Sequence, residues 1–283
     1  MIPKIAITLA IAFSATLASS ATIKKRVIGG EDAQDGEIRS IVSILNENST
    51  HECGGSLLDS TTVLTAAHCI NEDQILSVMA GTVDVETRGG VEAKVASFRK
   101  HPNYTRDKNN GGPWVENDIA VLKLSTPIEK SNTIDYATLP PVGSDAMVNS
   151  TAIAAGCRKD ADLQDRGIQA PILSLEGNFI PAKKLSKIVL TIRAREDCAK
   201  YDDGVGDRDT IICAGGIGKN LCLGDSGSPL FDQETGQLLG VMSRGIEVSG
   251  SYCYFAPDVF SRVGSYISFI NENLENSVTG QAA

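Results

Sequence analysis

Short apolar runs, several of them rich in β-branched residues, recur along the chain between turn-forming residues. They cover residues 38–45, 62–65, 75–80, 91–98, 119–124, 211–214, 238–243 and 259–263. Runs of this length, bounded by Gly, Asn and Asp, are typical of β-strands. Helical periodicity is confined to a segment that begins near Ser265, one face of which carries Tyr266, Ile267, Phe269, Ile270 and Leu274. The pattern predicts an all-β barrel or sandwich with a C-terminal helix.

A break in the middle of the chain divides the strand pattern into two parts. Residues 136–143 contain the pair Pro140-Pro141, which neither a helix nor a central strand tolerates. We therefore expect two β-domains, residues 27–138 and residues 139–275, followed by a tail at 276–283.

The N-terminal residues have the features of an export signal. A short basic start, Met1 to Lys4, precedes an apolar run that ends at Leu17, and the small residues of Ala18-Ser19-Ser20 follow. We expect a signal peptide at residues 1–20 and a secreted, extracellular protein. No apolar run approaches the roughly 20 residues of a transmembrane helix.

Charge and cysteine content narrow the classes of partner. Four of the 26 basic residues and none of the 35 acidic residues lie in residues 1–26, so 22 basic residues remain and the formal charge becomes −13. Nucleic acids and anionic membranes need a basic face, so neither is an expected partner. The seven cysteines of an exported chain indicate disulfides with one cysteine left over. Three sequons offer glycosylation candidates at Asn48, Asn103 and Asn149.

Residues suited to acyl transfer stand in recognisable contexts. The reaction needs a nucleophile, a base, a group that orients the base, and donors for the oxyanion. Ser226 lies in the segment Gly-Asp-Ser-Gly-Ser-Pro, His68 in Thr-Ala-Ala-His-Cys, and Asp118 in Asn-Asp-Ile-Ala-Val-Leu. We expect the other two histidines, His51 and His101, in loops or at the surface. No pair of histidines has metal-ligand spacing, so neither metal nor organic cofactor is expected.

At these segments the chain resembles the chymotrypsin-like serine proteases, over essentially all of residues 27–275. The matching segments occur in the family's order: 27–30 (VIGG), 53–57 (CGGSL), the His68 segment, the Asp118 segment, 212–215 (ICAG), the Ser226 segment and 257–263. The resemblance implies two six-stranded antiparallel β-barrels with the site between them. It also implies a serine endopeptidase that acts on protein or peptide substrates and meets protein protease inhibitors. We expect a monomer.

The resemblance assigns a role to each residue of the site. Ser226 is the nucleophile, His68 takes and returns its proton, and Asp118 holds the imidazole. The backbone N–H groups of Gly224 and Ser226 would form the oxyanion hole, and Ser243 and Gly245 would pair with the substrate backbone.

Activation and disulfide pairing follow from the same resemblance. Residues 21–26, which end in Lys24-Lys25-Arg26, would be an activation propeptide that another protease cuts after Arg26. The new α-amino group of Val27 would then pair with Asp225. The implied disulfides are Cys53–Cys69, Cys198–Cys213 and Cys222–Cys253. Cys157 is left over, as a thiol or in a bridge to another chain.

The primary specificity pocket departs from the family's pattern. Its base carries Asn220, where an Asp would select Lys or Arg, and Asp258 replaces a usual Gly in its wall. Three outcomes stay open: preference for Lys or Arg through Asp258, broad preference for larger side chains, or a pocket too filled for efficient cleavage. Arg244 replaces a usual Trp, which removes an aromatic platform for upstream substrate residues and favours acidic ones.

A second functional hypothesis follows from these departures. A secreted, non-catalytic homologue on the same fold could act as a binding or inhibitor protein. Such homologues usually lose a residue of the triad, whereas all three are present here.

Overall fold

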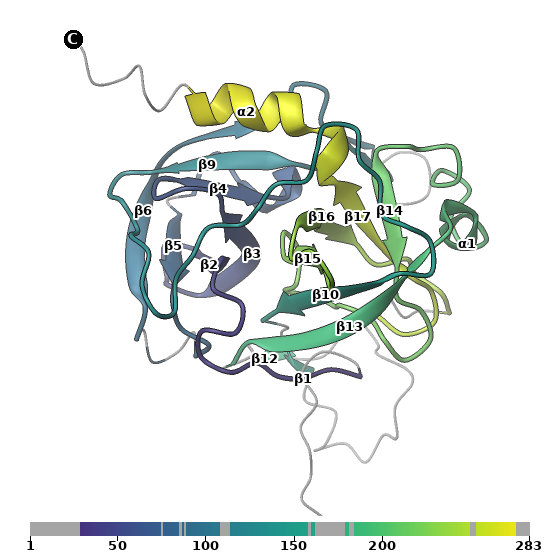
Figure 1. Ribbon diagram of the computed structural model, residues 1–283, viewed down its shortest axis with the longest axis horizontal. Helices are drawn as coiled ribbons and strands as arrows, with labels where there is room; N and C mark the ends of the chain where they lie inside the picture. The colour runs from purple at the N-terminus through teal and green to yellow at the C-terminus, as the bar shows by residue number, and fades with distance from the viewer. Residues whose placement is uncertain are drawn as a thin grey trace, which may run out of the picture.

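The computed structural model describes residues 29–74, 76–84, 87, 89–107, 114–157, 160–161, 179–180, 184–249 and 253–275. The expected signal peptide, the activation segment, Val27 and the tail at 276–283 lie outside the described residues. Within them, two β-barrels lie side by side (Figure 1). The predicted all-β class and the two six-stranded antiparallel barrels are confirmed.

The first barrel is a closed sheet of six antiparallel strands in the order β2-β3-β4-β9-β6-β5. In chain order they are β2 (Ile41–Leu45), β3 (His51–Leu57), β4 (Thr62–Thr65), β5 (Ser77–Ala80), β6 (Val91–Lys100) and β9 (Ala120–Leu124). Its core is aliphatic, and Leu57, Val63, Val78 and Leu122 are fully buried. A separate two-stranded hairpin, β7 (Thr105–Asp107) with β8 (Trp114–Glu116), precedes β9.

The second barrel closes through the pairing of β13 with β14. Its strands are β10 (Thr151–Gly156), β13 (Ser186–Arg193), β14 (Ile211–Ala214), β15 (Pro229–Asp232), β16 (Leu238–Arg244) and β17 (Asp258–Arg262). β1 (Glu31–Asp32) adds a seventh strand at the edge of β13, and β11 (Asp160–Ala161) pairs with β12 (Phe179–Ile180) in a small separate sheet.

Four barrel strands, β3, β10, β13 and β15, lie outside the apolar runs that predicted strands. In β3 the reason is close packing. A Cβ on Gly55 would lie 2.8 Å from a side-chain carbon of Val63, so the strand carries glycine where an apolar side chain would signal it. β10 is built from small residues for a similar reason, since a Cβ on Gly156 would lie 2.1 Å from Asp225 Oδ1.

The predicted C-terminal helix is α2 (Ile267–Glu275), which follows the 3₁₀ turn η2 (Val263–Ser265). Its apolar face covers the place where the barrels meet, because Ile267 and Ile270 pack with Leu64 of the first barrel and Val241 of the second. Other short helices are α1 (Arg195–Ala199) and the 3₁₀ turn η1 (Ala67–Cys69). None of the described helices is long and apolar enough to cross a membrane.

The segment that joins the barrels is extended and fixed to both of them. Ala137 N–H donates to Leu57 O of the first barrel at 2.8 Å, and Thr138 forms a parallel bridge with Gln237 of the second. The predicted linker at 136–143 thus lies between β9 and β10, where the chain passes from one barrel to the other. The domain limits at 138 and 139 remain a prediction.

Candidate active site

Loops from both barrels bring the three predicted catalytic residues to one place. His68 lies in η1 directly after β4, Asp118 lies just before β9, and Ser226 lies in the loop between β14 and β15. His68 and Ser226 line the same pocket, which has a volume of about 490 Å³. The site therefore lies between the barrels, where two sheets fix its parts independently.

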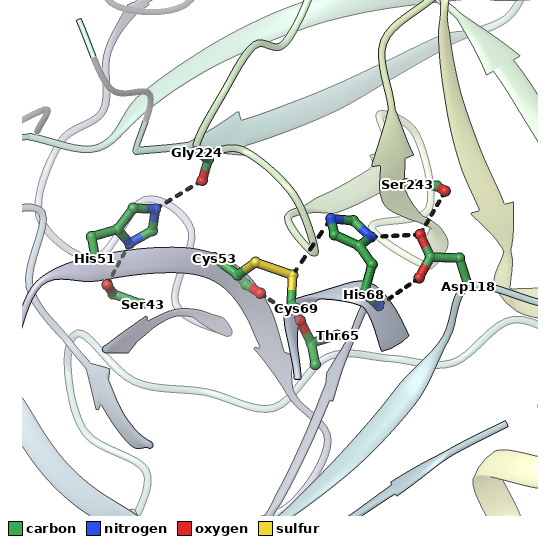
Figure 2. The surroundings of a disulfide bond; sticks show 10 residues. Ser43, His51, Cys53, Thr65, His68, Cys69, Asp118, Gly224 and Ser243 are labelled. Carbon is green, nitrogen blue, oxygen red and sulfur yellow. Dashed lines mark hydrogen bonds and ion pairs between the residues drawn. A yellow bond between two sulfur atoms is a disulfide. The ribbon is translucent and has the colours of Figure 1, made fainter. Parts of the chain in front are cut away.

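Asp118 is a buried carboxylate held by three hydrogen bonds (Figure 2). Its Oδ2 accepts from His68 Nδ1 at 2.7 Å and from the Ser243 hydroxyl at 2.7 Å. Its Oδ1 accepts from the backbone N–H of His68 at 2.9 Å. A fourth bond holds the backbone, because the Ser261 hydroxyl donates to Asp118 O at 2.7 Å. Two serines of the second barrel thus position an acid of the first.

The pKa of Asp118 is lowered from its ordinary value despite burial. Desolvation is the largest single influence and would raise this pKa, but the nearby His68 and the hydrogen bonds from His68 and Ser243 together outweigh it. Asp118 is therefore ionised at neutral pH. An ionised partner at Nδ1 fixes the tautomer of His68 that leaves Nε2 free to accept a proton.

His68 Nε2 lies beside the disulfide, 3.9 Å from Cys69 Sγ (Figure 2). Among the described residues no hydrogen bond joins Ser226 to His68. Catalytic hydrogen bonds often form only when the substrate binds. In the free protein, the relation between Ser226 and His68 is that both line the same pocket.

The loop around Ser226 is fixed to the first barrel by its backbone. Gly54 N–H of β3 donates to Ser226 O at 2.7 Å. Gly224 has a φ of 96°, a conformation that glycine adopts readily. Among the described residues, no backbone acceptor binds the N–H of Gly224 or of Ser226. The predicted role of these two groups as the oxyanion hole remains a prediction.

His51 was predicted to lie in a loop or at the surface, and this prediction is wrong. His51 is buried at the start of β3. Its Nε2–H donates to the carbonyl of Gly224 at 2.8 Å, and its Nδ1 lies 2.7 Å from the Ser43 hydroxyl (Figure 2). The only sequence signal for this role is its place next to the Cys53 segment. His101 is half-buried and packs edge-on against Tyr266 and Phe269.

Asp225, the predicted partner of the Val27 amine, is fully buried. Its Oδ2 accepts from the backbone N–H of Cys222 at 2.8 Å. A Cβ on Gly156 would lie 2.1 Å from its Oδ1, so the glycine of β10 makes room for this carboxylate. Val27 lies outside the described residues, and the pairing remains a prediction.

Asn220 and Asp258 lie beneath the pocket rather than among its lining residues. Both are fully buried. Asn220 Nδ2 donates to Ala256 O at 2.6 Å, and Asp258 Oδ2 accepts from Leu221 N–H at 2.7 Å. The pKa of Asp258 is raised well above its ordinary value, mainly by burial and to a smaller extent by the charge of Asp225. Hydrogen bonds from Leu221 and Asn220 lower this pKa but do not outweigh burial. We expect a neutral carboxyl group at this position.

The pocket itself has apolar and cationic walls. Ser243, Arg244 and Gly245, three of the predicted substrate-binding residues, line it together with Arg106, Val115, Cys222, Leu223, Met242 and Cys253. Arg244 forms an ion pair with Asp202, its Nη2 lying 2.5 Å from Asp202 Oδ2.

The three predicted disulfides are all present: Cys53–Cys69, Cys198–Cys213 and Cys222–Cys253. Cys157 lies outside them and is buried, 5% exposed. The sulfurs of Cys53 and Cys69 lie close to His68, but their mutual bond removes them as metal ligands. The three sequon asparagines, Asn48, Asn103 and Asn149, are exposed.

Comparison with known proteins agrees with this geometry. The family model described as Trypsin matches residues 27–270. The chain belongs to the trypsin family of serine proteases. Chymotrypsin-C of Rattus norvegicus is 34% identical over 264 residues, which cover 89% of this chain and 90% of the relative. Chymotrypsin-C of Mus musculus is 32% identical with the same coverage.

A solved structure supports the fold. Neuropsin, described as a serine protease expressed in the limbic system of mouse brain, superimposes with a TM-score of 0.69 and 23% identity, covering 87% of this chain and 98% of neuropsin. Family membership identifies the chain as a serine endopeptidase with the chymotrypsin fold.

Proposed function

We propose that this trypsin-family protein is a secreted endopeptidase that works through Ser226, His68 and Asp118. The observation that carries the proposal is the bond from His68 Nδ1 to the ionised, buried Asp118 at 2.7 Å, on the wall of the pocket that Ser226 also lines. The Ser226 hydroxyl attacks the scissile carbonyl carbon and passes its proton to His68 Nε2. The proton then goes to the leaving amine, and water repeats the sequence on the acyl-enzyme.

The oxyanion of each tetrahedral intermediate accepts hydrogen bonds from the N–H groups of Gly224 and Ser226. Donors that are already oriented stabilise the developing charge without reorganisation, and each is typically worth about 10²–10³ in rate. The bonds from Gly54 to Ser226 O and from His51 to Gly224 O support this role, because they hold the loop that carries both donors.

Cleavage after Arg26 would activate the protein by freeing the α-amino group of Val27. The fully buried Asp225 supports this proposal. A buried carboxylate is costly unless a cation or hydrogen bonds compensate it. The Val27 amine would supply the cation and fix the adjacent oxyanion loop.

At the bond to be cut, we infer a preference for large, uncharged side chains over Lys or Arg. The walls of the pocket include the Cys222–Cys253 disulfide, Leu223 and Met242, which are apolar. Asp258 is buried beneath them with a raised pKa. Ionising it there without a partner would be costly, so it offers little attraction to a cationic side chain.

Proteolysis before and after cleavage at Arg26 tests the proposed function. We expect hydrolysis of a peptide library only after cleavage, and its loss in Ser226→Ala. Asp118→Asn should lower kcat by about 10⁴, because the histidine tautomer is no longer enforced. An Arg26-cleaved protein that hydrolyses nothing but still binds peptides would support the non-catalytic homologue instead.

Matched peptides test the preference at the cut bond. Peptides that differ only in the residue before that bond should be cleaved faster with Leu, Met or Phe than with Lys or Arg. The isosteric variant Asp258→Asn should leave this order unchanged. A preference for Lys or Arg that Asp258→Asn removes would show that Asp258 selects the substrate.

A further inference from the structure

Two arginines line the pocket from opposite barrels. Arg106 lies in β7, in the hairpin that precedes β9, where it pairs with Val115 of β8. Arg244 ends β16, directly after the serine that donates to Asp118. Both line the pocket that contains His68 and Ser226. A chain with a formal charge of −9 thus presents two cations at its candidate active site.

The Arg244 guanidinium keeps donor capacity after its ion pair with Asp202. A guanidinium carries five N–H donors, and Asp202 Oδ2 contacts Nη2. Nε and Nη2 of Arg244 are both buried and have no hydrogen-bond partner among the described residues, beyond the ion pair of Nη2 with Asp202, so Nη1 is the nitrogen that remains for a substrate. The side chain is only 12% exposed, so water screens it weakly.

Asp202 holds Arg244 in place. Its own backbone N–H donates to Cys198 O at 3.1 Å, and its Oδ1 accepts from Gly204 N–H at 3.1 Å. The carboxylate is thereby fixed behind the guanidinium. Only Oδ2 of Asp202 contacts Arg244. The guanidinium is therefore held at the pocket wall but is incompletely paired.

A third arginine strengthens the positive field of this wall. Arg208 Nη1 donates to the carbonyl of Val115 at 3.0 Å, so it lies directly behind a pocket residue. Burial lowers its pKa first, Arg244 adds to that lowering, and Glu116 and Asp202 oppose it. An arginine stays charged under all ordinary conditions. Arg106 is exposed, and no described acid forms an ion pair with it.

We propose that this wall selects substrates with Asp or Glu upstream of the cut bond. Arg244 would donate to the substrate carboxylate from Nη1, and Arg106 would supply a second cation at the same pocket. The inference rests on the proposed function and deepens it, because it names a charge class for the substrate.

Peptides that differ at one upstream position test the proposal in the Arg26-cleaved protein. Glu is compared with Gln at each upstream position in turn, with the cut bond unchanged. We expect kcat/KM to favour Glu by about fivefold at one or more of them, which is about 1 kcal/mol, as for a partly exposed ion pair. The preference should fall as NaCl is raised.

Charge-neutral variants identify the residues that produce this preference. Arg244→Gln and Arg106→Gln should each bring the ratio for Glu over Gln toward one, and Asp202→Asn should raise it. The control is Arg99→Gln, an exposed arginine of β6 outside the pocket lining. It should leave the ratio unchanged. A ratio near one in the unmodified protein, or one that neither arginine variant alters, would overturn the proposal.

A binding measurement separates this inference from the proposed function. Peptides that end at the cut bond, with Glu or Gln upstream, are titrated against the Ser226→Ala variant. Tighter binding of the Glu peptide that Arg106→Gln weakens would support the charged wall even if the protein cleaves nothing. Equal binding of both peptides to a protein that does cleave would refute the wall and leave the proposed function intact.

Discussion

Two serines donate hydrogen bonds to the same aspartate at the same distance. Replacing each serine with alanine should lower the free energy of unfolding by different amounts, and the difference should depend on pH. Ser243 donates to the carboxylate of Asp118 and Ser261 to its backbone carbonyl, both at 2.7 Å. A hydrogen bond to a charged group is worth about 1.5–3 kcal/mol, and a neutral one about 0.5–1.5 kcal/mol. At pH 7, Ser243→Ala should therefore lower the free energy of unfolding more than Ser261→Ala.

The difference has a defined pH dependence. Asp118 has a lowered pKa in the folded protein, so its ionisation stabilises the fold above the unfolded pKa of about 3.9. That stabilisation is lost as the pH falls through the folded pKa. Ser243→Ala removes one of the hydrogen bonds that lower the folded pKa of Asp118, so it raises that pKa. The gap between the two variants should therefore close as Asp118 becomes protonated.

Urea unfolding from pH 7 down to pH 2 measures this gap. Both variants are made in the Ser226→Ala background, so that self-digestion does not interfere. The expected result is a gap of about 1–2 kcal/mol at pH 7 that shrinks below about pH 4. A gap that stays constant, or that widens in acid, would show that Ser243 does not act on an ionised Asp118.

Three further predictions concern the backbone, the seventh cysteine and the buried carboxyl beneath the pocket. Gly227→Ala should lower the free energy of unfolding by about 2–4 kcal/mol in urea titrations. Gly227 has a φ of 77°, and a Cβ there would lie 2.4 Å from Gly54 O. A thiol reagent should label Cys157 in denaturant but not in the native protein, since the residue is 5% exposed. Asp258 has a raised pKa in the folded protein. The stability of the unmodified protein should therefore fall as the pH rises from the unfolded pKa of Asp258 to its folded pKa. Thermal unfolding of Asp258→Asn should not show this fall.

The apolar pattern predicted a β-barrel or sandwich, and the resemblance to the chymotrypsin-like proteases implied the two barrels and the three disulfides, which the structure contains. The roles of Ser226, His68 and Asp118, which also come from that resemblance, remain a prediction. The apolar pattern did not reveal strands that carry glycine or small residues at close contacts. In β3, Gly54 and Gly55 pack against the nucleophile loop and β4, so their strand lacks an apolar pattern. Such contacts join residues far apart in the chain, and local propensity does not record them.

Within the site, the long-range polar partners were the parts that sequence reasoning missed. His51 bonds to Gly224 across 173 residues, and Ser261 bonds to Asp118 across 143 residues. A histidine or serine in isolation is as compatible with a surface as with a buried hydrogen bond. Asp258 was identified as a pocket residue from its motif, but its place beneath the lining depends on Leu221 and Asn220, which only the fold brings to it.

We propose that Ser226 becomes an activated nucleophile once the chain is cut after Arg26. Titration of the cut protein with a serine-directed, active-site phosphonate tests it most directly, with intact precursor and cut Ser226→Ala beside it. We predict labelling of one equivalent in the cut protein, at Ser226, and little in the two controls. No labelling in a protein with a correctly freed Val27 would contradict the account and favour a non-catalytic member of the family.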